Sequence, residues 1–351
     1  MTFADSMLGA AAATFDRAIV AAVRLRTATS PSRSERLSHD ERMDALAKIR
    51  EAYGAPEIWR EPNAYFTPPA PIAPSLVRVR TDGDVTVSDA SWPSAFEPYL
   101  PELREKYLGH ENNRTARARV YLGPRPRPAV VLLHGYLAGQ WAVEERAWPI
   151  GWLTRHFDVA IAVLPFHAVR ARTDRRAPPP FPGADPRFTN EGFRQAMHDI
   201  RALVGWLRAR GAPEVGVMGM SLGGYTTALL ATVEPGLAFA APIIPLASIA
   251  DFARDQGRLG TGAEEALQHR ALEEATRVVS PLARPSLVPK ERVLVVAGDA
   301  DRITPMSHAE RLARHFDARI VPFTGGHLLQ FGRRTAFREL GRWMRGAVAP
   351  G

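Results

Sequence analysis

The sequence predicts an α/β fold with a mostly parallel central sheet and helices on both faces. Short apolar runs alternate with longer helical patterns through the second half of the chain, as in parallel sheets with helical crossovers. One apolar run leads through a glycine-rich turn around Ser221 straight into a helix. Further polar motifs follow other apolar runs, at the strand ends where ligands of such sheets bind.

The first 75 residues predict a helical extension that precedes the sheet. Apolar residues recur at helical spacing at Phe15, Ile19, Val20, Val23 and Leu25. A linker rich in Ser, Thr and Arg spans 27–36. Ser38 and Glu41 form a capping-box pattern that begins a second helix, and Gly54 is its expected end. Four prolines between 68 and 74 then end the helical character.

From residue 76 the pattern predicts the strands of one large domain, 76–351. Residues 76–80 and 85–87 predict a hairpin around Asp82-Gly83, and 115–122 alternates like an exposed strand. Buried parallel strands are expected at 129–133, 159–164, 215–218, 238–244, 293–297 and 319–321. Helices are expected at 141–156, 191–210, 225–232 and 306–316.

The charge balance does not indicate a nucleic-acid partner. The net charge is +8, nearly all of it from scattered arginines with acidic residues among them. The densest cluster, Arg170, Arg172, Arg175 and Arg176, lies in a proline-rich stretch without aromatic residues. A basic balance without a binding motif is a weak signal. We therefore expect no nucleic-acid binding.

The absence of cysteine excludes disulfides, thiolate metal sites and a cysteine nucleophile. The N-terminus lacks a secretory pattern, because Asp5 comes early and Asp16-Arg17 interrupt the apolar run. The uncharged stretch 215–233 is divided by glycines into strand, turn and helix, so no integral membrane segment is expected. We expect a cytoplasmic protein; the oligomeric state stays open.

Ser221 is the candidate nucleophile. It lies in Gly219-Met220-Ser221-Leu222-Gly223, a G-x-S-x-G between a buried strand and a helix. This turn exposes a serine hydroxyl, and the flanking glycines, Gly219 and Gly223, let strand and helix approach each other. The helix N-terminus also favours developing negative charge. The alternative is a glycine-rich turn that serves packing alone.

The loop after the 129–133 strand predicts one half of an oxyanion hole. It reads Leu133-His134-Gly135-Tyr136. In sheets of this kind such a loop supplies one backbone donor, and the residue after the nucleophile supplies the other. We nominate the amides of Tyr136 and Leu222, with His134 and Gly135 supporting the loop. For His134 we favour a bracing role over proton transfer.

The acid and the base are expected after the next two strand ends. Asp299 and Asp301 both follow the 293–297 strand; Asp301, ahead of Ile-Thr-Pro and a helix, is the preferred orienting acid, and Asp299 is expected to cap the turn. His327 follows the last strand in Thr-Gly-Gly-His and is the candidate general base. Rival histidines are His167, His198, His269 and His308, of which His198 and His308 are expected at the surface.

Together these motifs resemble those of the α/β-hydrolase superfamily, from about residue 115 to 344. The likeness rests on LLHGY, GMSLGG, GDADRITP and TGGH, with the nucleophile, acid and histidine in the superfamily's chain order. It implies a serine hydrolase that acts on an ester, thioester or amide through an acyl-enzyme. A narrower likeness, through LPFHAVR and GMSLGGY, is to bacterial relatives of the α/β-hydrolase domain-containing protein 18 branch.

The predicted activity is cleavage of a small-molecule acyl ester, esterase-like or lipase-like, without cofactor or metal. No zinc-protease, P-loop or dinucleotide motif occurs. Alternatives are a peptidase, an acyltransferase or a perhydrolase with the same triad, and a non-catalytic binding protein on this fold. His167 and Met220 are candidate pocket-lining residues.

The segment 248–291 predicts a cap that selects substrates. It is much longer than the dozen or so residues of an ordinary crossover. Helical patterns cover 249–254 and 263–279, with Leu267, Leu272 and Ala275 on one face. The alternative is a long crossover packed at the side of the sheet.

Overall fold

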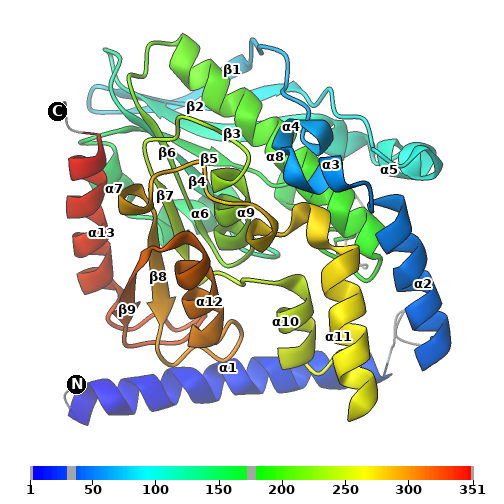
Figure 1. The fold of residues 1–351 in the computed structure, drawn as a ribbon. Coiled ribbons are helices and arrows are strands. Elements are labelled where there is room, and N and C mark those ends of the chain that lie inside the picture. The colour runs from blue at the N-terminus through cyan, green and yellow to red at the C-terminus, as the bar shows by residue number, and fades with distance from the viewer. Residues whose placement is uncertain (1–2, 30–36, 172–178, 349–351) are drawn as a thin grey trace.

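A nine-stranded sheet forms the centre of the computed structural model, which describes residues 3–29, 37–171 and 179–348. The strand order is β1-β2-β3-β5-β4-β6-β7-β8-β9. Neighbours from β5 through β9 run parallel, whereas β1, β2, β3 and β5 pair antiparallel in turn. Helices cover both faces (Figure 1), so the predicted fold class is confirmed.

The strands follow the predicted apolar runs closely. They are β1 Ser75–Asp82, β2 Val85–Pro93, β3 Thr115–Leu122, β4 Ala129–Leu133, β5 Asp158–Ala162, β6 Val215–Met220, β7 Ala240–Ile243, β8 Leu294–Gly298 and β9 Arg319–Phe323. The expectation of an exposed strand at 115–122 is wrong. β3 lies between β2 and β5, and six of its eight residues are buried. The alternation of Arg117 and Arg119 with alanines suggested an exposed face for the strand. The Arg119 guanidinium is nevertheless buried, because it forms ion pairs with Asp89 and Glu145.

The expected helices are present, with one break, and α5 and α13 are additional helices that the sequence analysis did not predict. They are α1 Phe3–Thr29, α2 His39–Ala52, α3 Pro56–Arg60, α4 Pro62–Tyr65, α5 Arg104–Leu108, α6 Trp141–Ala147, α7 Ile150–Leu153, α8 Pro186–Ala209, α9 Leu222–Ala231, α10 Ile249–Asp255, α11 Ala263–Ala275, α12 Met306–Phe316 and α13 Arg333–Ala347. The expected single helix 141–156 is two, because Pro149 has no N–H to donate and α6 ends before it.

Alternate residues of the buried strands enter two separate cores. Val131 and Leu133 of β4 pack in the first core with α8 and α9, whereas Val130 and Leu132 pack in the second with α7 and α13. This is the period of two expected of a pleated sheet that is covered on both faces. The carboxyl ends of the parallel strands are therefore left for loops, and the predicted motifs occupy them.

The N-terminal extension packs against the rest of the chain. In α2, the capping box of Ser38 and Glu41 is present, and Leu46 and Ile49 join the first core. Of the predicted apolar residues of α1, Phe15 is exposed and Val20 is partly buried, whereas Ala12, Ala13 and Asp16 are buried. The side chains of Ile19, Val23 and Leu25, and residues 30–36 of the expected linker, lie outside the described residues.

The predicted cap contains α10 and α11. Expected and observed helices agree, but Leu267 is exposed, so the apolar face assigned to α11 is wrong in part. Leu272 and Ala275 do pack toward the first core. The polar side of α11 meets α2, where Arg42 Nη1 donates to Gln268 Oε1 (3.0 Å) and Arg50 pairs with Glu274. Substrate selection by 248–291, like the domain boundary at 75/76, stays a prediction.

No helix within the described ranges has both the length and the apolar character needed to span a bilayer.

Candidate active site

Ser221 lies at a sharp turn between β6 and α9. Its φ of 55° and ψ of −113° place a non-glycine residue in a region that costs about 1–3 kcal/mol. The turn makes Ser221 the N-cap of α9 without a side-chain capping bond. Its hydroxyl is therefore available for chemistry.

The glycines beside Ser221 are required by space. A Cβ on Gly219 would collide with the backbone of Gly223, and one on Gly223 would collide with the carbonyl of Leu133. A Cβ on Gly224 would come within 2.8 Å of the Ile243 carbonyl oxygen. The helix can therefore sit against β4, β6 and β7 only where these side chains are absent.

Three of the predicted side chains form one hydrogen-bonded chain. The Ser221 hydroxyl donates to His327 Nε2, with Oγ and Nε2 2.9 Å apart, and His327 Nδ1–H donates to Asp301 Oδ2 at 2.8 Å. Asp301 is 1% exposed and His327 is 8% exposed. Since Nδ1 carries the proton toward Asp301, Nε2 has its lone pair toward Ser221, which is the tautomer that a general base needs.

Asp301 is held by four donors. Its Oδ1 accepts from the amides of Ile303 and Thr304, each at 2.8 Å, and its Oδ2 accepts from His327 and from the Thr304 hydroxyl at 3.0 Å. The Thr304 hydroxyl also lies 3.0 Å from His327 Nδ1. The sequence analysis did not identify Thr304 as a hydrogen-bond partner of Asp301, although the spacing Asp301-x-x-Thr304 is a turn pattern that indicates such a contact.

Asp299 lies on the same loop but contacts a different group. Its Oδ1 accepts from the amide of Gly325 at 3.2 Å, and its side chain is exposed. The contact joins the loop after β8 to the loop that carries His327. This position agrees with a turn-capping role and lies outside the Ser221–His327–Asp301 chain.

The rival histidines are bound elsewhere. His269 Nε2 lies 2.8 Å from Asp251, and His198 Nδ1 lies 3.4 Å from Asp199. The expectation that His308 lies at the surface is wrong: it is 2% exposed, and its Nδ1 accepts from the amide of Ala247. Its helix α12 packs onto β8 and β9, which the helical pattern alone does not reveal.

The two amides nominated for the oxyanion hole belong to segments that adjoin Ser221. A Cβ on Gly135 would lie 3.6 Å from the Ser221 Cβ, so the loop with Tyr136 borders the serine. Leu222 is the first residue of α9. Within the described residues, neither the Tyr136 nor the Leu222 amide donates to another protein group. Both are thus free to donate to an oxyanion, and their assignment stays a prediction.

His134 and His167 are buried behind that loop. His134 Nδ1–H donates to Gly135 O at 2.7 Å, and its Nε2 accepts from the Leu164 amide at 3.0 Å, so both ring nitrogens brace backbone. His167 Nδ1–H donates to Pro165 O at 2.8 Å, and its ring centroid lies 5.7 Å from that of Tyr136. Met220, the other candidate for the pocket wall, packs in the second core.

These two histidines predict a loss of stability in mild acid. Burial lowers the pKa of His134 to about 3 and that of His167 to about 4. In the unfolded chain a histidine binds its proton near pH ~6.5. Between about pH 6.5 and 4 the unfolded state therefore holds more protons than the folded state. As the pH is lowered through this range, the free energy of unfolding decreases by up to ~1.4 kcal/mol per pH unit for each histidine. We expect urea denaturation to show this fall, and His167→Asn, which can still donate to Pro165 O, to make it shallower.

The matched control for this pH dependence is His39→Asn, at a partly exposed histidine of α2. It should leave the slope unchanged. Equal slopes for the wild type and His167→Asn would contradict the prediction.

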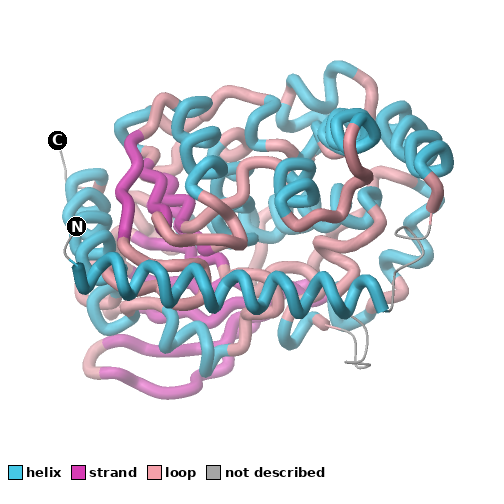
Figure 2. Tube along the Cα trace, turned by 90° about the horizontal axis from the view of Figure 1, so that it is seen from below, coloured by secondary structure: helices cyan, strands magenta, loops and turns pink. Residues whose placement is uncertain are grey.

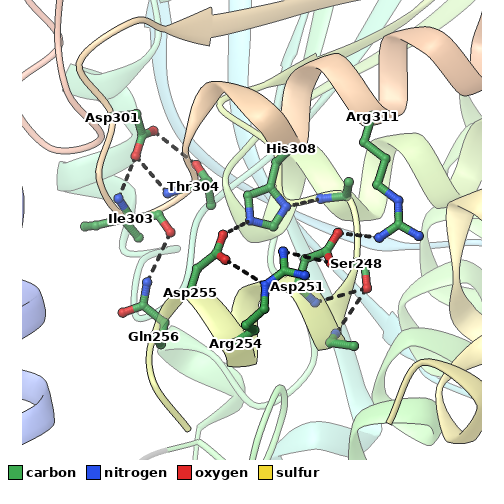
Figure 3. A network of polar contacts seen from close by, with 12 residues as sticks. Ser248, Asp251, Arg254, Asp255, Gln256, Asp301, Ile303, Thr304, His308 and Arg311 are labelled. Atoms are coloured by element: carbon green, nitrogen blue, oxygen red, sulfur yellow. Dashed lines mark hydrogen bonds and ion pairs between the residues drawn. The ribbon is translucent and has the colours of Figure 1, made fainter. Parts of the chain in front are cut away.

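A polar network joins the loop of Asp301 to α10 (Figure 3). Gln256 Nε2 donates to the carbonyl of Ile303 at 3.2 Å, and His308 Nε2–H donates to Asp255 Oδ2 at 3.2 Å. Asp251, on the same helix, forms an ion pair with Arg311 of α12. The predicted cap is thus attached to the loop that carries Asp301.

One buried residue at the site was missed by sequence reasoning altogether. Asp16 of α1 accepts hydrogen bonds from the amides of His327, Leu328 and Arg302. It belongs to the extension, far from every motif along the chain, and no local pattern marks it. Its contacts could therefore be recognised only from the three-dimensional structure.

Arg170 is the described member of the arginine cluster noted in the sequence, and it is buried. Arg170 is 1% exposed and pairs with Asp199 at 2.8 Å; it is a core residue and no part of a basic surface. Arg172, Arg175 and Arg176 lie outside the described residues. Among the residues that are described, no three His, Asp or Glu side chains are grouped so that they could hold a metal ion.

Comparison with known proteins identifies a matching family model and two relatives. Residues 192–324 match the model of the prolyl oligopeptidase family, a stretch that includes Ser221 and Asp301 and ends just before His327. The chain is 30% identical over 344 residues to the uncharacterized protein Rv2627c of Mycobacterium tuberculosis, covering 94% of this chain and 80% of the relative. The uncharacterized protein MT2702 from another strain of that species matches equally well.

Solved structures show the same fold at low sequence identity. The acetyl xylan esterase from Paenibacillus sp. R4 is 14% identical, with a TM-score of 0.59 over 86% of this chain and 99% of that one. Acetyl xylan esterase 1 from Thermoanaerobacterium sp. JW/SL YS485 is 16% identical, with a TM-score of 0.56 over 87% and 99%. Fold and family model agree that the chain belongs to the α/β-hydrolase superfamily of serine hydrolases, and at 30% identity it belongs to one family with Rv2627c.

Proposed function

We propose that this hydrolase cleaves carboxylic esters of small molecules through an acyl-enzyme on Ser221. The observation that carries the proposal is the unbroken hydrogen-bond chain from Ser221 Oγ through His327 to Asp301, with distances of 2.9 and 2.8 Å. A serine hydroxyl is a weak nucleophile by itself and is activated by an adjacent base that a third group orients. All three groups are present here in that arrangement.

The first half of the reaction forms the acyl-enzyme. Ser221 Oγ attacks the ester carbonyl while His327 Nε2 takes its proton, and the amides of Tyr136 and Leu222 donate to the resulting oxyanion. When the tetrahedral intermediate collapses, the bond to the alcohol oxygen breaks and His327 returns the proton to that oxygen. The alcohol leaves, and the acyl group stays on Ser221.

The second half repeats these steps with water. His327 removes a proton from the water as it attacks the acyl carbonyl, and the proton then passes to Ser221 Oγ as the carboxylic acid departs. Asp301 keeps its charge throughout and stabilises the imidazolium in both halves. No cofactor takes part in the proposed cycle.

The surroundings of Ser221 support an apolar acyl or alcohol group. Tyr136 and Leu137, on the oxyanion loop, are 41% and 61% exposed, and Leu328, next to His327, is 48% exposed. Large apolar side chains on loops that border a nucleophile offer contact area to an apolar substrate. The esterase names of the two structural neighbours agree with an ester, although at their identity they show the fold alone.

A peptidase is the second candidate, because the matched family model is that of prolyl oligopeptidases. A panel of p-nitrophenyl esters of rising chain length, beside aminoacyl p-nitroanilides, separates the two. We expect the esters to be hydrolysed with a kcat/KM at least about 100-fold above that of any amide. A higher kcat/KM on a p-nitroanilide would assign a peptidase, and turnover of neither class would contradict the proposal.

A further inference from the structure

Helix α1 lies against both loops that carry the acid and the base of the triad. Figure 2 shows it extended across one face of the molecule, and Figure 1 shows that this is the face toward which β8 points. Its inner side carries the small residues Gly9, Ala12 and Ala13. A Cβ on Gly9 would lie 3.7 Å from Ala300 and from Thr324, one on each loop. The helix axis can come this close because these side chains are small.

Asp16 follows on the same face and bonds to both loops. Its Oδ2 accepts from the amide of His327 at 2.7 Å and from that of Arg302 at 3.2 Å, while Oδ1 accepts from the amide of Leu328 at 3.2 Å. Arg302 follows the triad acid directly in sequence. One carboxylate therefore joins the backbone of the acid loop to the backbone of the triad histidine itself.

The position of Asp16 is unusual for a helical aspartate. Asp is a poor helix former, and a carboxylate that is 0% exposed loses its hydration. In the described part of the chain it has no salt-bridge partner, so backbone N–H groups take the place of water. A residue that violates local preference in this way is expected where the contact itself has a function.

Gly326 fits the same contact from the other side. A Cβ at this position would lie 2.5 Å from Asp16 Oδ2 and 3.2 Å from the Cβ of Ala12. The glycine before the triad histidine thus admits the carboxylate of α1 as well as shaping its loop. Asp16 and Gly326 form a complementary pair across 310 residues of sequence.

We propose that Asp16 is a positioning residue, through which the N-terminal helix fixes His327 relative to Asp301 and so completes the active site. The inference rests on the proposed function. Asp16 does not touch the reacting atoms; it acts through the backbone of the two loops. A displacement of about 1 Å in a catalytic group can cost about 100-fold in rate. Groups that orient metal ligands from behind contribute roughly 10- to 100-fold, and we expect an effect of the same order from a carboxylate that orients a histidine.

The test compares Asp16→Asn and Asp16→Ala with Asp40→Asn, an equal charge change at an exposed position of α2. Asp16→Ala should lower kcat on p-nitrophenyl acetate by roughly 10- to 100-fold with KM changed less than about 3-fold. Asp16→Asn keeps one acceptor oxygen and should fall between Asp16→Ala and the wild type. Asp40→Asn should match the wild type.

Gly326→Ala tests the contact from the loop side. It should lower kcat in the wild type and have a smaller additional effect in the Asp16→Ala background, because the collision with the carboxylate is then gone. Additive effects of the two changes would mean that the residues act separately. Unchanged kcat in Asp16→Ala would overturn the proposal, as would equal losses in kcat and in the folded fraction.

Hydrogen exchange measures the same positioning without any substrate. In Asp16→Ala the amides of 326–328 should exchange faster, while those of the β4–β6 core keep the wild-type rate. This readout separates the two hypotheses. Inactivity of the wild type on every ester would refute the proposed function alone, whereas unchanged exchange at 326–328 would refute the role of Asp16 alone.

Discussion

Replacing Ser221 with alanine is expected to lower kcat on the best ester of the panel by at least about 10³-fold. In the proposed mechanism the hydroxyl oxygen forms the bond to the acyl group, so no acyl-enzyme can form without it. A remnant of catalysis should persist, because the amides of Tyr136 and Leu222 still polarise the carbonyl. The measurement is steady-state hydrolysis across the ester panel.

Covalent labelling gives an independent measurement of the same claim. A fluorophosphonate probe should label the wild type and leave Ser221→Ala unlabelled, because the probe captures a serine activated by its base. Ser307→Ala, at an exposed serine of α12, is the matched control and should label like the wild type. Equal labelling of Ser221→Ala would show that another residue is the nucleophile.

The Ser221→Ala protein should remain folded, which makes the loss of rate interpretable. The hydroxyl makes one hydrogen bond, to His327, and lies at the partly exposed end of the turn. The backbone strain at Ser221 persists in alanine, since it arises from φ and not from the hydroxyl. The midpoint of thermal unfolding should therefore change by a few degrees at most.

The features that the sequence predicted well are those determined by nearby residues. The buried strands, the turn around Ser221 and the capping box of α2 depend on local pattern, and all are present. The order of motifs along the chain was also informative, because the carboxyl ends of parallel strands lie along one edge. Hence Ser221, Asp301 and His327 could be named together although 106 residues separate the first from the last.

The features that it missed depend on contacts between distant segments. Helical spacing placed His308 at the surface, but α12 packs on the sheet and buries it. Apolar spacing chose Phe15 for the inner side of α1, whereas the helix is bound through small residues and Asp16. A carboxylate that is buried because it accepts hydrogen bonds from the backbone of two distant loops produces no periodic pattern in the sequence. Similarly, the chain alone did not show that α11 would turn its polar side to α2.

Substitution of the two aspartates after β8 is expected to have very different effects on kcat. Asp301→Asn should lower kcat by about 10³- to 10⁴-fold with the fold intact. The amide of an asparagine here cannot rotate freely: its oxygen is needed by the amides of Ile303 and Thr304, which bond Oδ1 of the aspartate. The NH₂ group then faces His327 Nδ1, which must accept in place of donating. Nε2 would carry the proton and could no longer take one from Ser221.

Asp299→Asn is the matched change and should cost less than about 5-fold. It removes the same charge two residues away, but asparagine Oδ1 can still accept from the amide of Gly325, and the side chain is exposed. Parallel measurement of kcat and of urea unfolding for both variants decides the assignment. A larger loss of kcat in Asp299→Asn would make Asp299 the orienting acid. Comparable losses of kcat in both variants, with both proteins folded, would show that the tautomer argument at Asp301 is wrong. The rate would then depend on the negative charge near the loop and not on the hydrogen bond to His327.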